Sequence, residues 1–188
     1  MVVTASDVAG LVRAMSPYDE TEAVHRADAL AWLRSTTDVF RRSPPATPAK
    51  HLVAYFLLSD PDDGSVFLVH HRRAGLWLPT GGHVESGEDP ADTVRREAPE
   101  ELGVAARFAS GQAQPLFLTV TDTVGDPRAS HTDVSLWYLL HASRSDPLRP
   151  DEREFAAARW WGRDEVAGAD TASLEPHLRR FLAKLDGR

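Results

Sequence analysis

The sequence of 188 residues contains no cysteine and no long apolar run. Without cysteine, disulfide bonds, thiolate nucleophiles and cysteine-ligated metals are excluded. No stretch approaches the roughly 18–20 apolar residues that a membrane-spanning helix needs, and the first residues, MVVTASDV, lack the basic and apolar pattern of a secretory signal. We therefore expect a cytoplasmic protein that has no membrane partner.

Positive charge is also scarce, and lysine most of all. The chain has 28 acidic residues against 21 basic ones, which gives a formal net charge of −7. An acidic chain without a basic stripe or a helix-turn-helix pattern is not expected to bind nucleic acid. Only Lys50 and Lys184 are lysines, so we expect any phosphate-binding group to be an arginine, whose planar fork binds oxygens in pairs.

A proline-rich segment, SPPATPAK at 43–50, divides the chain into two parts of different character. It is too rich in proline for a helix or a strand and indicates a linker. We therefore expect an N-terminal helical extension, 1–45, in front of a second domain, 46–188. Three roles stay open for the extension: to cover an active site, to mediate a homodimer, or to add to the core.

Short apolar runs between turn residues dominate the middle of the chain and indicate strands, whereas patterns with helical spacing lie at both ends. The predicted strands cover 51–58, 65–71, 105–109, 115–123, 133–141 and 156–161. The predicted helices cover 5–15, 16–35, a short segment around 164–167 and 173–185. Turns at 60–64 and at Gly125-Asp126-Pro127 join the first two strands and the 115–123 and 133–141 strands into hairpins.

The stretch GHVESGEDPADTVRREAPEELGV, 82–104, contains a predicted helix with clear ends. Asp89 before Pro90 is a good helix start, and Gly103 is a good stop because glycine adopts a left-handed conformation easily. Pro99 falls inside this helix, where proline removes a hydrogen bond and clashes with the preceding turn at a cost of about 3 kcal/mol. We therefore expect the helix to bend or loosen near this proline.

Three carboxylates of this helix share one face. Glu97, Glu100 and Glu101 are spaced i, i+3 and i+4, which keeps them within about 100° of arc. Such like charges repel, by about 0.2–0.5 kcal/mol for each close pair on an isolated helix. A solvated acidic face is the simpler interpretation of most glutamate-rich helices. A bound divalent cation would instead turn the repulsion into a site, and carboxylate oxygens suit Mg²⁺ or Mn²⁺.

The spacing of the whole stretch favours the metal site. Its fixed positions are Gly82, Glu88, Arg96, Glu97, Ala98, Glu100, Glu101, Gly103 and Val104. They follow the pattern G, five residues, E, seven residues, R-E-aliphatic-x-E-E-x-G-aliphatic, which resembles the Nudix box of the MutT-like Nudix hydrolases. The resemblance implies an α/β (α+β) fold with a mixed β-sheet sandwiched between helices, and the predicted strands over about 50–165 agree with it.

The resemblance also implies a metal site and catalytic residues. Mg²⁺ or Mn²⁺ is the expected cofactor, and its ligands are expected to be Glu97, Glu100, Glu101 and the carbonyl of Gly82. Arg96 is expected to pair with Glu88 or a neighbouring carboxylate and to fix the helix face. Bound ions of this kind neutralise diphosphate oxygens and activate a water for in-line attack on phosphorus.

The general base that takes a proton from this water stays open between two places. One candidate is Glu97, on the same helix face as the expected ligands. The others are Glu152 and Glu154, on a late acidic loop. A loop carboxylate that does not bind metal keeps more of its basicity than a ligand does, but acidic surface loops are also common without any catalytic role.

Four further residues are candidates for substrate binding: Arg72, Trp77, His83 and His131. The arginine offers a phosphate contact, and the tryptophan offers a ring on which a base can stack. The alternatives without a role in substrate binding are a core position for Trp77, an exposed loop position for His83 and a structural role for His131 at the start of a strand.

The expected reaction is metal-dependent hydrolysis of a diphosphate bond in a nucleoside diphosphate linked to another group X. Positions 119–122, TVTD, lack the marks of the ADP-ribose and dinucleoside-polyphosphate subgroups, and the missing cysteine argues against isopentenyl diphosphate isomerase. The alternative is a non-catalytic, Nudix-like ligand sensor. Sensors commonly lose box carboxylates, and this chain retains all of them.

Overall fold

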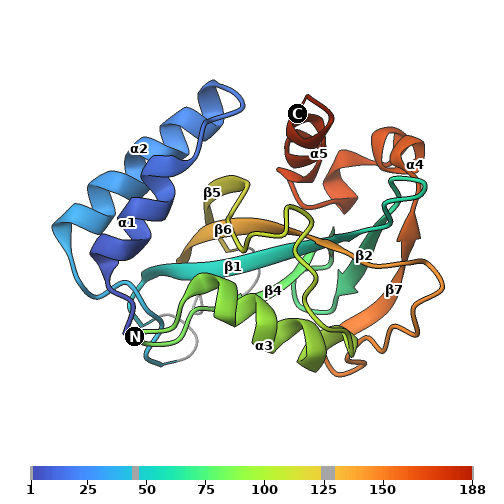
Figure 1. Cartoon of the computed structure of the whole chain (residues 1–188), viewed down its shortest axis with the longest axis horizontal. Helices are drawn as coiled ribbons and strands as arrows, with labels where there is room; N and C mark the ends of the chain where they lie inside the picture. Colours follow the sequence, from blue (N-terminus) through green and yellow to red (C-terminus); the bar gives the residue numbers. More distant parts are fainter. Residues whose placement is uncertain (1, 44–46, 124–129, 188) are drawn as a thin grey trace. The chain divides into compact units, whose positions relative to one another are not determined.

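A computed structural model describes residues 2–43, 47–123 and 130–187. Its elements are, in chain order, α1 (Ala5–Ala14), α2 (Glu20–Ser35), β1 (Lys50–Ser59), β2 (Val66–His71), β3 (Trp77–Leu78), β4 (Thr80–His83), α3 (Pro90–Leu102), β5 (Phe117–Asp122), β6 (Thr132–His141), β7 (Phe155–Trp161), α4 (Arg163–Gly168), the 3-10 helix η2 (Thr171–Ser173) and α5 (Leu178–Asp186) (Figure 1). Within the described ranges, no helix combines the length and the apolar character that crossing a membrane requires.

The described strands form one seven-stranded sheet, which together with the helices confirms the predicted α/β (α+β) class. The path of the sheet is β3-β2-β1-β6-β5, while β4 pairs with β1 and β7 pairs with β2. Both predicted hairpins are antiparallel, with Leu58 opposite Phe67 in β1–β2 and Phe117 opposite Trp137 in β5–β6. The turn predicted at Gly125-Asp126-Pro127 lies outside the described residues.

The chain forms two compact units, each assembled from separate segments. Unit 1 comprises Met1–Tyr55, Gly81–Val94 and Ala113–Tyr138, and unit 2 comprises Phe56–Thr80, Arg95–Gln112 and Leu139–Arg188. Strands β1 and β6 and helix α3 each begin in one unit and continue into the other. The predicted division into 1–45 and 46–188 stays a prediction, and the boundary itself lies outside the described residues.

In unit 1, α1 and α2 lie side by side as a helical hairpin (Figure 1). Helix α2 begins at Glu20 and not at 16–17 as predicted, because the side chain of Asp19 accepts a hydrogen bond from the backbone N–H of Glu22 at 2.8 Å and caps the helix there. The buried carboxylate of Glu22 in turn accepts the backbone N–H of Leu118, on β5, at 3.2 Å. The helical segment is therefore hydrogen-bonded to the sheet of its own unit.

The strands of unit 1 approach each other closely at Gly81 on β4. A Cβ atom at this position would lie 2.3 Å from the carbonyl oxygen of Ala54 and 2.8 Å from the Cα of Tyr55, both on β1. No side chain fits there, so glycine is required for β4 to pack against β1. Gly82 and His83 directly follow this contact on β4.

Unit 2 corrects two predictions from the sequence. The strand predicted at 105–109 is absent, and only Phe108 makes an isolated bridge, to Leu140. The last helix begins at Leu178 and not at 173, because the residue before Pro176 is disfavoured in helical conformation. The short η2 helix ends at Ser173, where the α-helix was predicted to begin.

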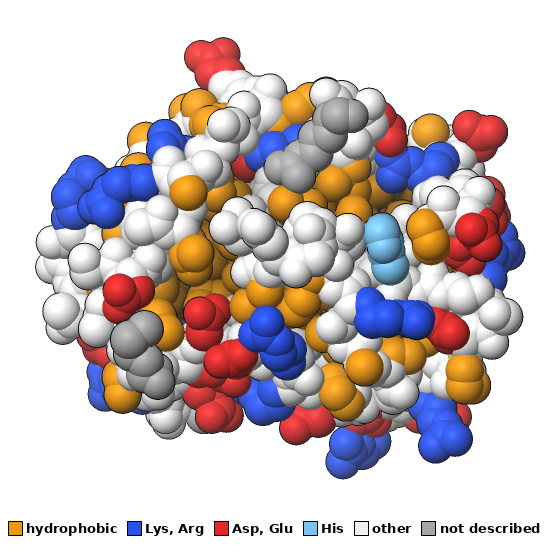
Figure 2. Space-filling view, in the orientation of Figure 1, with side chains coloured by type: hydrophobic (Ala, Val, Ile, Leu, Met, Phe, Trp, Pro, Cys, Tyr) orange, Lys and Arg blue, Asp and Glu red, His pale blue; other side chains and the backbone are white. Residues whose placement is uncertain are grey.

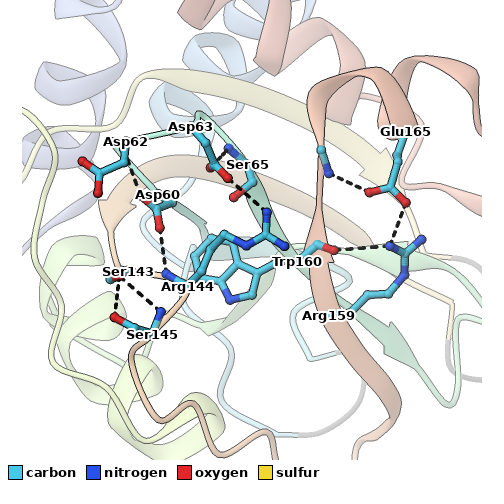
Figure 3. Close-up of polar contacts among 11 residues, drawn as sticks. Asp60, Asp62, Asp63, Ser65, Ser143, Arg144, Ser145, Arg159, Trp160 and Glu165 are labelled. Atoms are coloured by element: carbon cyan, nitrogen blue, oxygen red, sulfur yellow. Dashed lines mark hydrogen bonds and ion pairs between the residues drawn. The ribbon is translucent and has the colours of Figure 1, made fainter.

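Polar contacts hold the turn between β1 and β2 against a later loop of unit 2 (Figure 3). The backbone N–H of Arg144 donates to Asp60 at 2.7 Å, and its guanidinium donates to Asp63 at 3.0 Å. Beside them, the guanidinium of Arg159 on β7 donates to Glu165 on α4 at 3.1 Å. These contacts fix surface segments of the unit and explain its acidic residues there without a ligand.

Candidate functional site

Helix α3 has the ends that the sequence predicts. The side chain of Asp89 accepts the N–H of Ala91 at 2.8 Å, and the helix runs from Pro90 to Leu102. Gly103 follows with φ = 71°, in the left-handed region that favours glycine. The helix continues through the position of Pro99, and a local bend there stays a prediction.

The three expected metal ligands on α3 differ in exposure. The side chain of Glu97 is 14% exposed and that of Glu100 is 63% exposed, whereas Glu101 is buried. On the face drawn in Figure 2, acidic side chains gather around α3. The acidic face is thus graded from solvent to interior, which differs from the uniformly exposed face that helical spacing alone suggests.

Arg96 lies against the neighbouring carboxylates, as the resemblance implies. Its guanidinium donates a short hydrogen bond to Glu97 and lies 3.9 Å from a carboxylate oxygen of Glu100. Glu88, the other expected partner, accepts the hydroxyl of Thr93 at 2.8 Å. An arginine held in this way orients the carboxylates.

Negative charge accumulates around Glu97. Burial raises the pKa of its carboxyl, Arg96 lowers it, and the nearby carboxylates of Glu100 and Glu154 raise it further. A divalent cation would relieve the burial and the repulsion together, and hard oxygen donors suit Mg²⁺ or Mn²⁺. These residues therefore fit the metal that the sequence pattern implies.

The loop that carries the alternative bases meets the C-terminal end of α3. The N–H of Asp151 donates to the carbonyl of Glu101 at 2.9 Å. Arg72 binds the same loop, since its backbone N–H donates to the carbonyl of Glu154 at 2.9 Å and its side chain to the carbonyl of Glu152 at 3.1 Å. Glu154, but not Glu152, is among the charges that shift the pKa of Glu97.

Trp77 packs among aromatic and cationic side chains of unit 2. Its ring makes edge contacts with His70 and Trp161, at 5.3 and 5.2 Å between centroids, and the guanidinium of Arg159 lies 5.7 Å away. Its carbonyl accepts the N–H of Glu175 at 2.9 Å. This environment is typical of a packing residue, which was the alternative interpretation of Trp77.

Unit 1 brings two of the candidate substrate residues, His83 and His131, together with His51 and Asp133. One ligand atom from each of the four lies within 4.8 Å of all the others. His51 comes from β1, His83 from β4, and Asp133 from β6, which His131 immediately precedes. The imidazole rings of His51 and His131 are stacked, with 4.7 Å between centroids.

Burial shapes the protonation of this cluster. It is the main cause that lowers the pKa of His51, and it lowers the pKa of His83 to about 3, with further contributions from Arg41 and the other two histidines. Burial also raises the pKa of Asp133, against the attraction of His131 and Arg41. The cluster therefore disfavours charge of either sign on its own groups.

Beside the cluster, unit 1 contains a cleft of about 410 Å³. It is lined by Arg41, Arg42, His83, Val84, Glu85 and Ser86. Arg41 contributes to the field on three members of the cluster. The cleft thus combines two guanidinium groups with the backbone segment that follows Gly82, the expected carbonyl ligand on β4.

His51 and the carboxylate of Asp133 were missed as site residues by sequence analysis. The only local signal was the spacing of His131 and Asp133, since residues i and i+2 of an extended segment point to the same side. His51 lies 80 positions before His131, so nothing in the local sequence pattern connects them. Their association depends on the pairing of separate strands.

Comparison with known proteins connects the pattern at 82–104 to a family. The family model described as "NUDIX domain" matches residues 49–185. The NAD-capped RNA hydrolase ndx-9 of Caenorhabditis elegans is 28% identical over 139 residues, and the match covers 72% of this chain and 35% of the relative. The m7GpppN-mRNA hydrolase NUDT17 of Xenopus laevis is 33% identical over 94 residues, covering 45% of this chain and 31% of the relative.

A solved structure agrees with these sequence matches. The MutT NUDIX hydrolase from Burkholderia pseudomallei superimposes with a TM-score of 0.55 at 25% identity, covering 72% of this chain and 98% of that one. The chain spans about a third of the length of these two curated relatives. Because the family model covers most of its length, the chain belongs to the NUDIX domain family.

Proposed function

We propose that this protein is a metal-dependent hydrolase that cleaves the diphosphate bond of a nucleoside diphosphate linked to another group. The observation that carries the proposal is the graded carboxylate face of α3, with Glu97 and Glu101 withdrawn from solvent and Glu100 exposed. Membership of the NUDIX domain family supports the reaction class. The similar MutT structure supports it from the fold.

In this proposal, Glu97, Glu100, Glu101 and the carbonyl of Gly82 hold Mg²⁺ or Mn²⁺. Such an ion neutralises diphosphate oxygens and makes a bound water more acidic. Arg96 acts through its contacts with Glu97 and Glu100 and keeps their oxygens oriented. Water attacks one phosphorus in line, and the bridging P–O bond breaks to release two phosphate-terminated products.

A carboxylate must accept the proton of the attacking water. Glu97 is the first candidate, because it is largely enclosed on the ligand face and held by Arg96. Glu154 is the stronger of the two loop alternatives. Its charge is among those that raise the pKa of Glu97, and the charge of Glu152 is not. A base contributes about 10²- to 10⁴-fold to the rate.

The roles of three candidate substrate residues, His83, Arg72 and Trp77, are not equally supported. His83 lines the cleft with Arg41 and Arg42, which suits an anionic ligand. Arg72 has its side chain engaged with the loop of the alternative bases, which suits a positioning role. Trp77 packs against Trp161 and is the weakest candidate. Mg²⁺ dependence, a cytoplasmic location and homodimerisation stay predictions.

A substrate panel tests the proposal directly. Nucleoside triphosphates, oxidised nucleotides, nucleotide sugars and dinucleotides are incubated with the full chain and with Mg²⁺ or Mn²⁺, and products are separated by chromatography. NAD-capped and m7G-capped RNA belong in the panel because two relatives carry these substrates in their names. We expect turnover of small nucleotide-like diphosphates that stops with EDTA.

Binding without turnover across the panel would contradict the hydrolase and favour the alternative, a Nudix-like sensor. Retention of every box carboxylate argues for catalysis, because a pure binding module has no need for a base beside metal ligands. Turnover of capped RNA alone would overturn the prediction that the protein has no nucleic-acid partner.

A further inference from the structure

The cluster of His51, His83, His131 and Asp133 in unit 1 has no role in the proposed hydrolysis as a set. Its members come from three strands or their immediate neighbours. The side chain of His51 is fully buried, and those of His131 and Asp133 are 10% and 14% exposed. Three imidazoles and a carboxylate in such a small, enclosed volume need a compensating interaction.

The cluster leaves polar atoms of buried side chains without hydrogen bonds. Nε2 of His51 and Oδ1 of Asp133 are both buried, and neither has a hydrogen-bond partner among the described residues. They nevertheless lie only 3.5 Å apart. Both atoms can offer a lone pair, so a cation bound between them would satisfy both.

A contact on the far side of the His51 ring fixes its orientation. Nδ1 of His51 lies 2.7 Å from the carbonyl oxygen of Pro48. A carbonyl only accepts, so Nδ1 carries the proton and donates it, and the lone pair is left on Nε2, which faces the cluster. Histidines that bind metals are typically held by a hydrogen bond of this kind from the other ring nitrogen.

The distances fit a transition metal. In a tetrahedral zinc site with bonds of about 2.0–2.1 Å, neighbouring ligand atoms lie about 3.3 Å apart. Oδ1 of Asp133 lies 3.2 Å from Nε2 of His131 and 3.5 Å from Nε2 of His51. All four ligand atoms fall within 4.8 Å of one another, so modest side-chain rotations complete the set.

We propose that His51, His83, His131 and Asp133 form a zinc site that is separate from the carboxylate site on α3. Imidazole nitrogen suits Zn²⁺, whereas the glutamates of α3 suit hard ions such as Mg²⁺. Four protein ligands fill a tetrahedral shell and leave no position for water, which is typical of a structural site. The site therefore ties β1, β4 and β6 together.

This cross-link bears on the proposed catalytic site through the chain itself. His83 directly follows Gly82, the expected carbonyl ligand, on β4. A metal bound by His83 would hold this segment of β4 against β1 and β6 and limit the motion of the Gly82 carbonyl. The zinc site would thus act as a positioning device, without contact with the substrate.

Arg41 is the charged neighbour that opposes cation binding. It contributes to lowering the pKa values of His51 and His83. The negative charge of Asp133, whose carboxylate oxygen lies 3.2 Å from Nε2 of His131 and 3.5 Å from Nε2 of His51, offsets the charge of Arg41.

Metal analysis of the tag-free full chain tests the site first. Protein stripped with a chelator is titrated with Zn²⁺, and separately with Co²⁺, in the presence of excess Mg²⁺. We expect about one Zn²⁺ per chain with a dissociation constant near or below about 10⁻⁹ M, and a Co²⁺ absorption spectrum typical of tetrahedral coordination. Binding no tighter than about 10⁻⁵ M, or an octahedral Co²⁺ spectrum, would overturn the proposal.

Variants then assign the ligands. His51→Ala, His131→Ala and Asp133→Asn should each lose the tight Zn²⁺ and the rise in melting temperature that Zn²⁺ gives the stripped wild-type protein. His141→Ala, on the same strand as Asp133, is the matched control and should retain both. Circular dichroism verifies that each variant is folded, and Asp133→Asn keeps the shape of the site if an alanine variant unfolds.

The test also separates this site from the carboxylates of α3. Glu100→Gln and Glu101→Gln should bind Zn²⁺ like the wild type, whatever their turnover. Loss of tight Zn²⁺ in these variants, together with its retention in the histidine variants, would assign the ion to α3 and overturn the proposal. Because this readout is metal content, it is independent of whether the substrate panel succeeds.

Discussion

The carboxylate face of α3 and the histidine cluster of unit 1 represent two ways of gathering ligands. On α3, Glu97, Glu100 and Glu101 belong to a single turn and a half of helix, and their exposure runs from 63% for Glu100 to a buried Glu101. In the cluster, all members are withdrawn from solvent and come from separate strands. The first arrangement suits an exchangeable ion that meets a substrate, and the second suits an ion that stays.

Charge separates the two regions as clearly as geometry does. Glu97 sits among like charges, and Arg96 is the counter-charge that lies against it. In the cluster, burial keeps His83 neutral, with its pKa lowered to about 3. A hard divalent ion is attracted to concentrated negative charge, whereas a borderline ion is bound by neutral nitrogen donors.

The largest effect that would test this comparison is loss of turnover on α3. We expect Glu100→Gln and Glu101→Gln each to lower kcat/KM at limiting Mg²⁺ by at least about 100-fold, since even outer contacts of a metal ligand cost 10–100-fold when removed. The measurement is steady-state hydrolysis of the best substrate of the panel over a range of Mg²⁺ concentrations.

Asp92→Asn is the matched control, because Asp92 is an exposed acid on the same helix that is not one of the fixed positions of the stretch. It should keep turnover close to that of the wild type. Near-normal activity of either glutamate variant at limiting Mg²⁺ would mean that the substituted glutamate is not a metal ligand. Glu100 would then be a solvated surface group, or Glu101 a buried structural group.

A second effect concerns the division of labour among the carboxylates. Glu97→Gln should lower kcat by about 10²- to 10⁴-fold at saturating Mg²⁺ if Glu97 is the base. Glu154→Gln should have a smaller effect, and Glu152→Gln, whose carboxylate is not among the charges that shift the pKa of Glu97, is the comparison from the same loop. Rates and Mg²⁺ affinity are measured for all three variants.

The split between rate and affinity is decisive. A base variant loses rate and retains metal affinity, whereas a ligand variant recovers its rate as Mg²⁺ is raised. Recovery by Glu97→Gln, together with a large and unrecovered loss in Glu154→Gln, would move the base to the loop that binds the C-terminal end of α3 through Asp151.

The ease with which each region could be predicted follows from the distance of its contacts along the chain. Helix ends depend on neighbouring residues, so Asp89, Pro90 and Gly103 were sufficient to bound α3. The end of a helix is misjudged where one local preference opposes another. Leu174 and Leu178 continue the apolar stripe, but Pro176 between them prevents the helix from starting before it.

The cluster could not be predicted because it depends on strand pairing. Sequence analysis named His83 and His131 separately, as substrate contacts, and did not connect either of them to His51. Which strands become neighbours is decided by the sheet as a whole, in which β4 and β6 reach the same strand β1 from distant parts of the sequence. The wrong prediction of a strand at 105–109 has the same cause, because a short apolar run forms a strand only when it pairs with a neighbouring strand.

Glu175, in unit 2, shows the effect of burial on the pKa of a carboxyl group that lies outside both the α3 face and the histidine cluster. Its side chain is buried, and burial raises its pKa to about 7 against the backbone N–H of His177, which donates to it at 2.7 Å. The folded protein therefore keeps this proton between pH 4.5, the ordinary value, and about 7, whereas the unfolded chain releases it. The free energy of unfolding falls over this interval as the pH rises.

We accordingly expect Glu175→Gln to be more stable than the wild type above pH 7, by about 3 kcal/mol, and equal to it below pH 4.5. Urea unfolding from pH 4 to 8 measures the gap. Glu165→Gln is the opposite control, because the pKa of Glu165 is lowered by the N–H of Gly162 and by Arg159, so its removal costs stability at high pH. A constant gap for Glu175→Gln would mean that burial does not shift this group.

The smallest expected effect concerns Pro99, on the exposed side of α3. Proline has no N–H to donate to the carbonyl of Arg95, and an interior proline costs a helix about 3 kcal/mol. The native helix accommodates part of that cost, so Pro99→Leu should raise the free energy of unfolding by about 1 kcal/mol. Pro61→Leu is the control, since Pro61 lies in the exposed turn after β1, where proline stiffens the unfolded chain and leucine should slightly destabilise.

Turnover of Pro99→Leu then tells whether the proline matters to the carboxylates. Pro99 lies between Ala98, which is buried, and Glu100, which is exposed, so a change in local winding rotates Glu100 and Glu101 relative to Glu97. If stability rises and kcat/KM is unchanged, the proline is merely tolerated, and helical spacing alone sets the ligand face. A stabilised but inactive variant would show that the ligand face depends on local distortion at Pro99. Helical spacing alone would then not define the site on α3, and its contrast with the histidine cluster, which depends on strand pairing, would be smaller.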